Sequence, residues 1–416
     1  MDREVRTLIE IGDIIISSVD KKTKDNERPI RLCNYTDVYK NDFIRSNMDF
    51  MTATATDHEI AKCTLLKGDV VITKDSEKYD DIGVPAFIKE DIDNLLCGYH
   101  LVILRPSTGK VDGAYLFYAL NTQESKHQFH ANANGITRFG LRKGDIENIT
   151  IPVPPISEQR AIAHILGTLD DKIELNRRMN ETLEAMARAI FKSWFVDFDP
   201  VRAKAEGRPT GLPDEIDELF PDSFEESELG EIPKGWEVKS IGEVVEFAYG
   251  KALKVSNRKP GKVLVFGSNG QVGLHNEALV KGPGIIIGRK GNPGIVTWSY
   301  EDFFPIDTTF YVKKTRIISS LKYLFYALKT QDLPSLSADS AVPGLNRNLA
   351  YMSKFLVPNE KVLMAFDGQI DLIFQMIYAN EKEINTLASL RDTLLPKLIS
   401  GEMRIPDAEI IIEAMI

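Results

Sequence analysis

Three sets of polar and basic residues, each present once in either half of this 416-residue chain, carry side chains suited to nucleic acid. Phosphates are bound by Lys, Arg and small polar groups, and base edges are read by the planar donors and acceptors of Arg, Asn and Gln. The first set is Arg138, Arg142 and Lys143, with Asn346, Arg347 and Asn348 as its counterpart; the second is Lys74, Ser76 and Lys78, with Arg289, Lys290 and Asn292; the third is Asn34, Tyr35 and Thr36, with Ser268, Asn269, Gly270 and Gln271. Further candidates for phosphate contacts are Lys21, Lys22, Lys24, Lys251 and Lys254. Any one of these residues could instead be a solvated charge or a turn residue, so the prediction depends on the recurrence of the sets.

Motifs for catalysis are missing from the sequence. It has no NPPY- or DPPY-type tetrapeptide and no FxGxG for methyl transfer, and no GxxxxGK[ST] for ATP-driven translocation. Pro221-Asp222 followed by Glu237-Val238-Lys239 formally resembles a PD…ExK nuclease signature, but Glu4-Val5-Arg6, its counterpart in the first half, has no Pro-Asp before it. His127 and His130 lack a third metal ligand at a suitable spacing. We therefore expect no catalytic residue and no metal site, and we read Gly288, Gly291 and Gly294 as turn residues.

These candidate residues belong to a sequence that repeats itself at half its length. The hexapeptide YLFYAL occurs at 115–120 and at 323–328, which are 208 residues apart. Weaker matches follow in the same order, namely Thr137-Arg138 with Asn346-Arg347, and Val153-Pro154 with Val357-Pro358. Each half reads as a β-rich stretch followed by a long helix, which indicates one unit built twice. We expect the YLFYAL aromatics to pack in the core of each half rather than to stack on bases.

Two long helices are predicted at 157–196 and 359–400. Each carries a strict 4-3 spacing, which is the a/d seam of a coiled coil. The seam positions of the first helix are Ile162, Leu166, Leu169, Ile173, Asn176, Asn180, Leu183, Ala187, Ile190 and Trp194, and those of the second are Phe366, Ile370, Ile373, Ile377, Asn380, Ile384, Leu387, Arg391, Leu394 and Leu398. The offset of 204 residues aligns Asn176 with Asn380 near mid-seam, where we expect the two buried asparagines to meet and to help fix the register. The alternative is a plain amphipathic helix on a globular core.

Composition restricts the setting in which the chain works. The net charge is −10, but Asp214 to Glu231 holds nine acidic residues and no Lys or Arg, so the rest of the chain is nearly neutral and can still bind DNA through local basic clusters. Cys33, Cys63 and Cys97 form no CxxC pair, which favours a reducing, cytoplasmic setting without disulfides. The N-terminus resembles no signal peptide, and no uncharged apolar run approaches the roughly 20 residues of a membrane span.

The run IPVPPISEQRAIAHILGTLDDKIELNRRMNETLEAMARAIFKSWFVDFDPV is similar to the central conserved region of the specificity subunit of Type I restriction-modification systems. LGEIPKGWEVKSIGEVV resembles the start of its second target recognition domain, and GIIIGRKGNPGIV and LRDTLLPKLISGEMRI fit the same family. The resemblance covers nearly the whole chain and is weakest in the first recognition domain.

This resemblance implies a DNA-reading subunit without catalysis of its own. Its fold would be α+β, with two β-rich target recognition domains joined by two long helices that form an antiparallel coiled coil. Each recognition domain would read one half of a bipartite target in double-stranded DNA. The helices would set the spacer and dock two modification subunits, which bind S-adenosylmethionine, and restriction subunits with ATP and Mg would complete the nuclease.

The expected segments and their tests follow from this interpretation. The segments are recognition domains at 1–155 and 236–357, helices at 156–198 and 358–402, an acidic, Pro-rich connector at 199–235 and a tail at 403–416. Removing the charge of Arg138 or Arg347 should weaken DNA binding, and Asp in place of Ile173 or Ile377 should break subunit assembly. The alternatives are a specificity subunit of a combined nuclease-methyltransferase, and a coiled-coil scaffold that binds only proteins.

Overall fold

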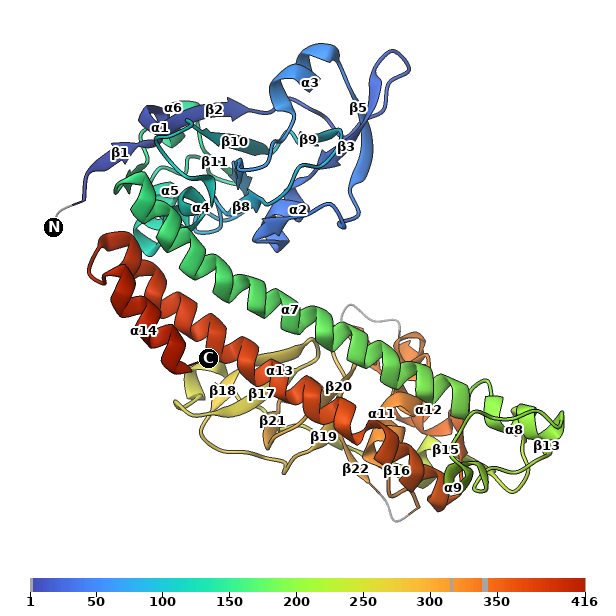
Figure 1. Ribbon diagram of the computed structural model, residues 1–416. Coiled ribbons are helices and arrows are strands. Elements are labelled where there is room, and N and C mark those ends of the chain that lie inside the picture. Colours follow the sequence, from blue (N-terminus) through green and yellow to red (C-terminus); the bar gives the residue numbers. More distant parts are fainter. Residues whose placement is uncertain (1–2, 315–316, 339–342, 416) are drawn as a thin grey trace. The chain divides into compact units, whose positions relative to one another are not determined.

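The chain forms two compact units that both contain parts of the two long helices. A computed structural model describes residues 3–314, 317–338 and 343–415 (Figure 1). Unit 1 is Met1–Asn176 with Glu383–Ile416, and unit 2 is Arg177–Lys382. The long helices are α7 (Ile156–Phe195) and α13 (Glu360–Ser400). They lie within a residue of the helices predicted at 157–196 and 359–400, whereas the segments 156–198 and 358–402 extend up to three residues beyond them.

Unit 1 is built on a five-stranded mixed sheet in the order β2-β10-β6-β8-β4. Its strands are β2 (Gly12–Ile16), β10 (Leu101–Pro106), β6 (Val70–Thr73), β8 (Pro85–Ile88) and β4 (Phe43–Ile44), and a three-stranded sheet of β5 (Met51–Ala55), β3 (Arg28–Cys33) and β9 (Leu95–Cys97) lies in the same unit. All four residues of β6 are buried, as in strands that are covered on both faces. The smaller elements are β1 (Val5–Thr7), α1 (Leu8–Ile11), α2 (Tyr35–Lys40), α3 (Asp57–Cys63), β7 (Asp75–Ser76), α4 (Gly113–Leu120), α5 (Gln123–Ala131), β11 (Phe139–Gly140), α6 (Lys143–Glu147), β12 (Thr150–Pro152) and α14 (Ile405–Met415).

Unit 2 repeats this topology. Its larger sheet has the order β16-β22-β19-β20, formed by β16 (Val245–Tyr249), β22 (Thr309–Lys314), β19 (Gly284–Gly288) and β20 (Val296–Ser299), and its smaller sheet contains β18 (Gly270–His275), β17 (Val263–Gly267) and β21 (Phe303–Pro305). In both smaller sheets the central strand pairs in parallel with one neighbour, β3 with β9 and β17 with β21. The remaining elements are α8 (Asp199–Ala205), α9 (Asp214–Asp217), β13 (Phe224–Ser227), β14 (Gly230–Pro233), β15 (Glu237–Ser240), α10 (Ile241–Val244), a 3-10 turn at Val255–Asn257, α11 (Leu321–Thr330), a 3-10 turn at Leu333–Leu336, β23 (Ser337–Ala338), β24 (Gly344–Leu345), α12 (Arg347–Met352) and β25 (Lys354–Val357). The predicted internal repeat is therefore confirmed at the level of strand order.

The repeated hexapeptide forms the buried helix of each unit. All six YLFYAL residues are buried in α4 and again in α11. The Tyr115 hydroxyl donates a hydrogen bond of 2.8 Å to the Pro152 carbonyl of β12, and the Tyr323 hydroxyl donates to the Leu356 carbonyl of β25. The same tyrosine thus ties the helix to the strand before each long helix, which confirms the prediction of core packing.

The two long helices pair antiparallel within each unit. In unit 1, Arg391 donates to Asp170 at 2.6 Å, and Asn176, further along α7, donates to Glu383, which lies earlier on α13, at 3.0 Å. In unit 2, Asn380 donates to Asn180 at 2.8 Å. Successive residues of α7 therefore pair with residues of α13 in decreasing order of residue number, which is the antiparallel arrangement.

The register of this pairing corrects one prediction. Asn176 and Asn380 are both buried, as expected, but the partner of Asn380 is Asn180 and that of Asn176 is Glu383. Glu383 lies about one helical turn beyond Asn380 on α13, and so the antiparallel stagger replaces the expected Asn176–Asn380 pair with two other pairs.

Most predicted seam side chains are buried. The buried positions are Ile162, Leu166, Leu169, Ile173, Leu183, Ala187 and Trp194 on α7, and Phe366, Ile370, Ile373, Ile377, Leu387, Leu394 and Leu398 on α13. Asn180, Ile190, Ile384 and Arg391 are half-buried.

By length and composition alone α13 could cross a membrane, yet Phe366, Ile370 and Ile377 belong to the core of unit 2.

The acidic segment between the halves is folded onto unit 2. Phe220 lies with its ring centre 5.0 Å from that of Trp194, and Phe198 contacts both Phe224 and Trp236. The segment therefore has an apolar side that packs in the core, while its carboxylates remain mostly exposed. The predicted tail likewise contains a helix, α14, with Ala408 fully buried.

Candidate nucleic-acid interface

Two of the three predicted sets meet at one end of the larger sheet in unit 1. Lys74 directly follows the fully buried strand β6, and Ser76 lies on β7, which pairs with β11 directly after Arg138. The third set begins at Asn34, whose side chain accepts from the Tyr35 amide at 3.0 Å and so starts α2. Burial raises the pKa of Tyr35, whereas its hydrogen bond with Ser76 and the charge of Arg138 oppose that shift. Tyr35 therefore lies beside residues of both other sets.

Residues that were not predicted hold this surface together. His100 Nδ1 lies 2.8 Å from Asp75 and 3.2 Å from an Arg138 terminal nitrogen. The Lys74 ammonium lies 4.5 Å from the ring centre of Tyr99. An aromatic-histidine pair directly before the strand β10 is the sequence signal that could have pointed to Tyr99 and His100.

The remaining cations of unit 1 fall into two places. Lys78, Arg142 and Lys143 are exposed near the same strand ends, and the Leu141 amide donates to the Lys74 carbonyl at 2.9 Å. Lys21, Lys22 and Lys24 precede β3, whereas Asn34 follows it, so this six-residue strand separates the two by roughly 20 Å. Lys22 and Lys24 also pair with Asp20 and Glu27. The structure thus leaves these lysines apart from the convergent surface.

All three predicted sets converge in unit 2. The Ser268 hydroxyl lies 2.6 Å from the carbonyl oxygens of both Lys290 and Thr308, to either of which it can donate, and Asn292 donates to Asn269. The Asn346 side chain accepts from two backbone amides and caps α12. A Cβ at Gly288 would lie 2.3 Å from the Asn292 carbonyl oxygen, so a glycine there allows the loops to approach. Gly291 and Gly294 have positive φ and serve turns, as predicted, whereas Gly288 is the last residue of strand β19 and not a turn residue.

Two arginines of these loops share one aromatic ring. The guanidinium carbons of Arg289 and Arg347 each lie 4.8 Å from the ring centre of Tyr249, the last residue of β16. Tyr249 was not predicted, although an aromatic residue before Gly250 at a strand end is a signal for it. Lys251, Lys254, Gln271 and Asn348 are exposed in the same unit.

Backbone pairing corrects one match between the halves. The Leu345 amide donates to the Arg289 carbonyl at 2.8 Å, just as Leu141 donates to Lys74 in unit 1. Asn346-Arg347 therefore corresponds to Arg142-Lys143, and the predicted match with Thr137-Arg138 is wrong by five residues. The resemblance of the two dipeptides was local, whereas hydrogen bonding between segments distant in sequence decides which positions are equivalent.

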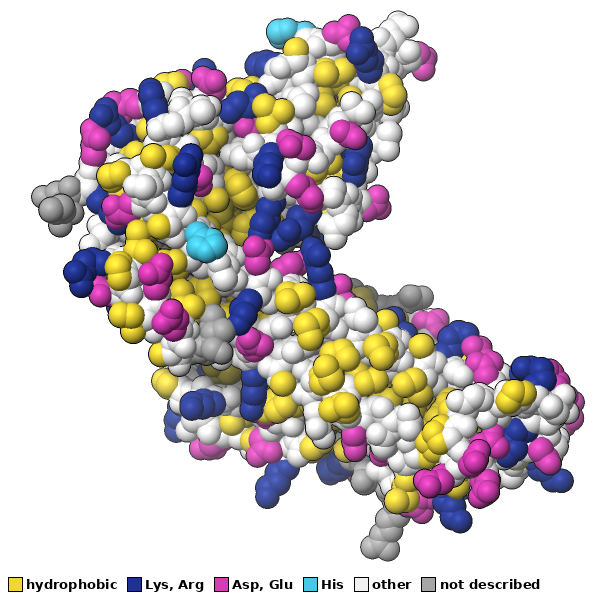
Figure 2. Space-filling view, in the orientation of Figure 1, with side chains coloured by type: hydrophobic (Ala, Val, Ile, Leu, Met, Phe, Trp, Pro, Cys, Tyr) yellow, Lys and Arg dark blue, Asp and Glu magenta, His cyan; other side chains and the backbone are white. Residues whose placement is uncertain are grey.

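The long helices expose an apolar stripe. Within unit 2, Met186 is 50% exposed on α7, and Met364 and Leu372 are 65% and 64% exposed on α13. Figure 2 shows hydrophobic side chains gathered over α7 and α13 on the face that it draws. Exposed apolar side chains on helices mark a surface that another protein can cover.

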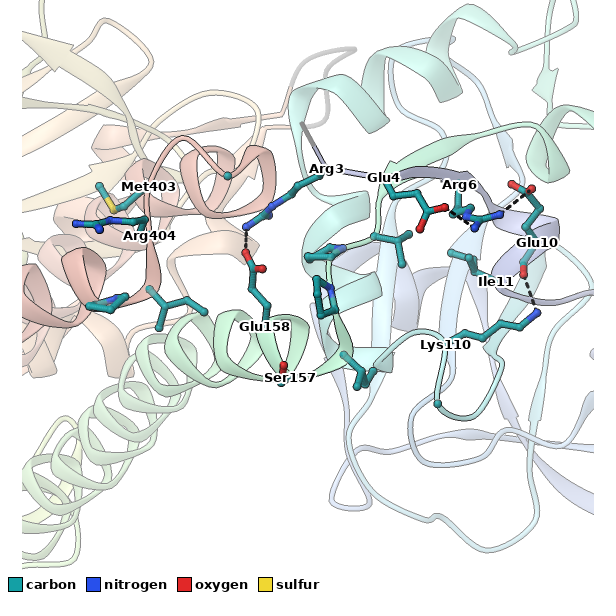
Figure 3. A pocket seen from close by; sticks show the side chains of 18 residues that line it. Arg3, Glu4, Arg6, Glu10, Ile11, Lys110, Ser157, Glu158, Met403 and Arg404 are labelled. Atoms are coloured by element: carbon teal, nitrogen blue, oxygen red, sulfur yellow. Dashed lines mark hydrogen bonds and ion pairs between the residues drawn. The ribbon is translucent and has the colours of Figure 1, made fainter. Parts of the chain in front are cut away.

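A cavity of about 1270 Å³ opens in unit 1 between β1, the start of α7 and the turn after α13 (Figure 3). Arg3 crosses it, donating to Glu158 and to the carbonyl of Ile399 at 2.6 Å. Most other charges on its wall are also paired, and Lys110 donates to the Glu10 carbonyl at 3.2 Å. We interpret the polar contacts around this cavity as links that hold the three chain segments together, and not as a reaction site.

The described residues contain no group of three His, Cys, Asp or Glu placed to hold a metal ion. His127 and His130 lie on α5, and Lys239 of the nuclease-like pattern pairs with Glu237 at 2.7 Å.

Comparison with known proteins agrees with the two-unit organisation. The family "Type I restriction modification DNA specificity domain" matches residues 2–185 and 233–372, once on each half. The chain belongs to this family. It is 26% identical to the Type I restriction enzyme HindI specificity subunit of Haemophilus influenzae, over 94% of this chain and 98% of that protein. It is 25% identical to the Type I restriction enzyme MjaIX specificity subunit of Methanocaldococcus jannaschii, over 98% and 94%.

A solved structure shows the same fold. The S subunit of a Type I restriction-modification system from M. genitalium is 20% identical and superposes with a TM-score of 0.58, covering 96% of each chain. The fold of this specificity-family chain is therefore the predicted one, with two β-rich recognition domains and paired antiparallel helices.

Proposed function

We propose that this chain is the DNA specificity subunit of a Type I restriction-modification complex and that each unit reads one half of a bipartite target. The observation that carries the proposal is the convergence of equivalent loops at equivalent strand ends in both units. Lys74 in unit 1 and Arg289 in unit 2 occupy the same backbone position, and each lies over an aromatic ring. Two similar surfaces rich in Arg, Lys and Asn suit a target with two parts.

Two modification subunits dock on the helices in this proposal. The exposed stripe with Met186, Met364 and Leu372 supplies an apolar surface on the coiled coil. Since the halves of the chain are repeats, a second equivalent contact is expected in the other half. Restriction subunits then join the assembly.

The chain itself supplies recognition and positioning. S-adenosylmethionine belongs to the modification subunits, and ATP and Mg belong to the restriction subunits. The proposed setting is the reducing cytoplasm, which suits Cys33, Cys63 and Cys97 as buried free thiols.

The test is co-expression with the partner modification subunit, followed by long-read mapping of methylated bases in the host DNA. We expect one split motif with a fixed spacer that disappears when this chain is deleted. Assembly with the methyltransferase without any motif would contradict the reading function. Failure to assemble at all would favour the scaffold.

A further inference from the structure

The geometry points to a guanine-binding site in unit 2, formed by Arg289 and Arg347 at their shared contact, Tyr249. This inference rests on the proposed function and specifies the base that one unit reads. It divides the candidate residues into those that read bases and those that hold phosphates.

Arg289 is held with its planar group in a fixed place. Its guanidinium carbon lies 4.8 Å from the centre of the Tyr249 ring and 5.7 Å from that of Phe310. One terminal nitrogen donates to the Asp307 carbonyl at 3.0 Å, which leaves further N–H groups of the guanidinium without a protein acceptor among the described residues. A guanidinium that is already immobilised loses little entropy when it binds, which suits the directional pairing with a base edge.

Arg347 is held in a similar way. Its guanidinium carbon lies 4.8 Å from Tyr249 and 5.7 Å from Tyr351, and one terminal nitrogen donates to the Phe247 carbonyl at 3.4 Å. The Nε atom is buried and has no hydrogen-bond partner among the described residues. Arg258 has the same buried, unpartnered Nε, so the feature that distinguishes Arg347 is its place over the Tyr249 ring.

Charge makes the site complementary to an acceptor-rich ligand. The guanidiniums of Arg289 and Arg347 lie over the same ring, so two positive charges are close together. Neither forms an ion pair with a carboxylate of residues 3–314, 317–338 or 343–415, so these charges are not neutralised within the described part of the chain. Guanine offers two adjacent acceptors, O6 and N7, on its major-groove edge, and a bidentate arginine is their commonest partner. Phosphate oxygens share this acceptor chemistry, so an experiment has to separate the two.

The other basic residues of unit 2 differ from these arginines. Lys251 and Lys254 are exposed and belong to no stacked pair among the described residues. A flexible ammonium acts as a point charge, which suits phosphate and carries no base information. Unit 1 has a lysine, Lys74, at the position of Arg289, so the site belongs to unit 2.

The deciding variants are Arg289→Lys and Arg347→Lys in the complex with the modification subunit. Lysine keeps the positive charge but lacks the planar fork, so it keeps a phosphate contact and loses bidentate guanine recognition. The matched control is Arg258→Lys, because Arg258 lies in the same unit, donates to the Val272 carbonyl and shares the buried, unpartnered Nε of Arg347, but is not one of the two arginines over the Tyr249 ring. Long-read methylation mapping is the readout, and Arg138→Gln in unit 1 identifies the half read by the other unit.

We expect at least one required guanine in the half read by unit 2. Arg289→Lys or Arg347→Lys should relax that position by roughly tenfold to a hundredfold, as for one bidentate pair, and leave the other half unchanged. Where a variant no longer methylates, competition binding with duplexes substituted at each guanine gives the same readout.

A half without guanine would overturn the inference. A phosphate contact would also overturn it. Its signs would be an unchanged methylation motif in both Lys variants, together with an Arg289→Gln variant that loses DNA affinity equally for all sequences. In that variant the slope of log affinity against log salt concentration would also fall by about 1. Both results leave a split motif that depends on this chain, whereas absence of any such motif contradicts the proposed function itself.

Discussion

At the scale of single residues, the contact between the YLFYAL helix and the long helix differs in chemistry between the two units. In unit 1, Asp170 is 5% exposed and accepts from the Tyr118 hydroxyl and from Arg391, each at 2.6 Å. The corresponding residues of unit 2 are Tyr326 and Phe374, whose ring centres are 6.2 Å apart. A buried carboxylate destabilises the fold unless its charge is paired, whereas two packed aromatic rings bury no charge.

Asp170→Asn should therefore destabilise unit 1. The substitution leaves the guanidinium of Arg391 without its buried counter-charge, and we expect a loss of roughly 3 kcal/mol in the free energy of unfolding. Denaturant unfolding of the purified chain measures this value. Asp392→Asn is the matched control, because Asp392 also pairs with Arg391 but is 64% exposed and should change stability by less than about 0.5 kcal/mol. Equal losses in the two variants would show that burial of the pair is irrelevant.

A second residue-scale prediction concerns pH. Burial and the nearby charge of Glu184 raise the pKa of Glu381 to about 7, above the usual 4.5. The folded chain therefore binds a proton more tightly than the unfolded chain, and the stability linked to this proton decreases as pH rises from about 4.5 through 7. Glu381 is nevertheless an exposed residue, so screening by solvent limits the effect, which we expect to stay below about 1 kcal/mol.

Glu381→Gln tests this linkage. The variant should raise the melting temperature at pH 8 and leave it unchanged at pH 5, as followed by thermal unfolding at both values. A stabilisation of the same size at both pH values would contradict the assigned titration.

At the scale of elements, α13 uses its faces for different tasks. Ile370 is fully buried against unit 2, whereas Leu372, two residues later, is 64% exposed. Helical periodicity separates these positions onto different faces, so one serves the fold and the other is free for a partner.

Ile370→Ala and Leu372→Asp should therefore have opposite effects. Ile370→Ala removes buried volume and should lower stability by about 2–5 kcal/mol. Leu372→Asp should leave stability nearly unchanged but weaken co-purification with the modification subunit at least tenfold. Denaturant unfolding and pull-down titration separate the two effects, and normal assembly of the Leu372→Asp variant would exclude this stripe as the docking surface.

At the scale of the whole molecule, recognition surfaces that lie in different units should act independently. Arg138 belongs to unit 1 and Arg289 to unit 2, and they share no contact partner among the described residues. Energetic effects at distant sites without shared partners usually add.

The double variant Arg138→Gln/Arg289→Gln should thus lose a binding free energy equal to the sum of the single losses, within about 0.5 kcal/mol. Competition binding to target duplex measures all four proteins. A coupling above about 1 kcal/mol would show that the units read their half-sites cooperatively.

Features that depend on local pattern were determined by the sequence alone. The repeat is visible from an identical hexapeptide, and both long helices follow from a continuous heptad spacing that begins shortly after a proline. Motif absences and the basic loop sets are likewise properties of neighbouring residues. Each of these signals needs only the side-chain periodicity of a single element.

Other features were decided only by tertiary structure. The stagger of the helices moved the partner of Asn176 to Glu383, and strand pairing moved the counterpart of Arg347 from Arg138 to Lys143. Tyr249 comes from β16, yet it lies against arginines that are 40 and 98 residues further along the chain. No local pattern carries such information, because hydrogen bonds and ring contacts between distant segments exist only once the sheets have paired.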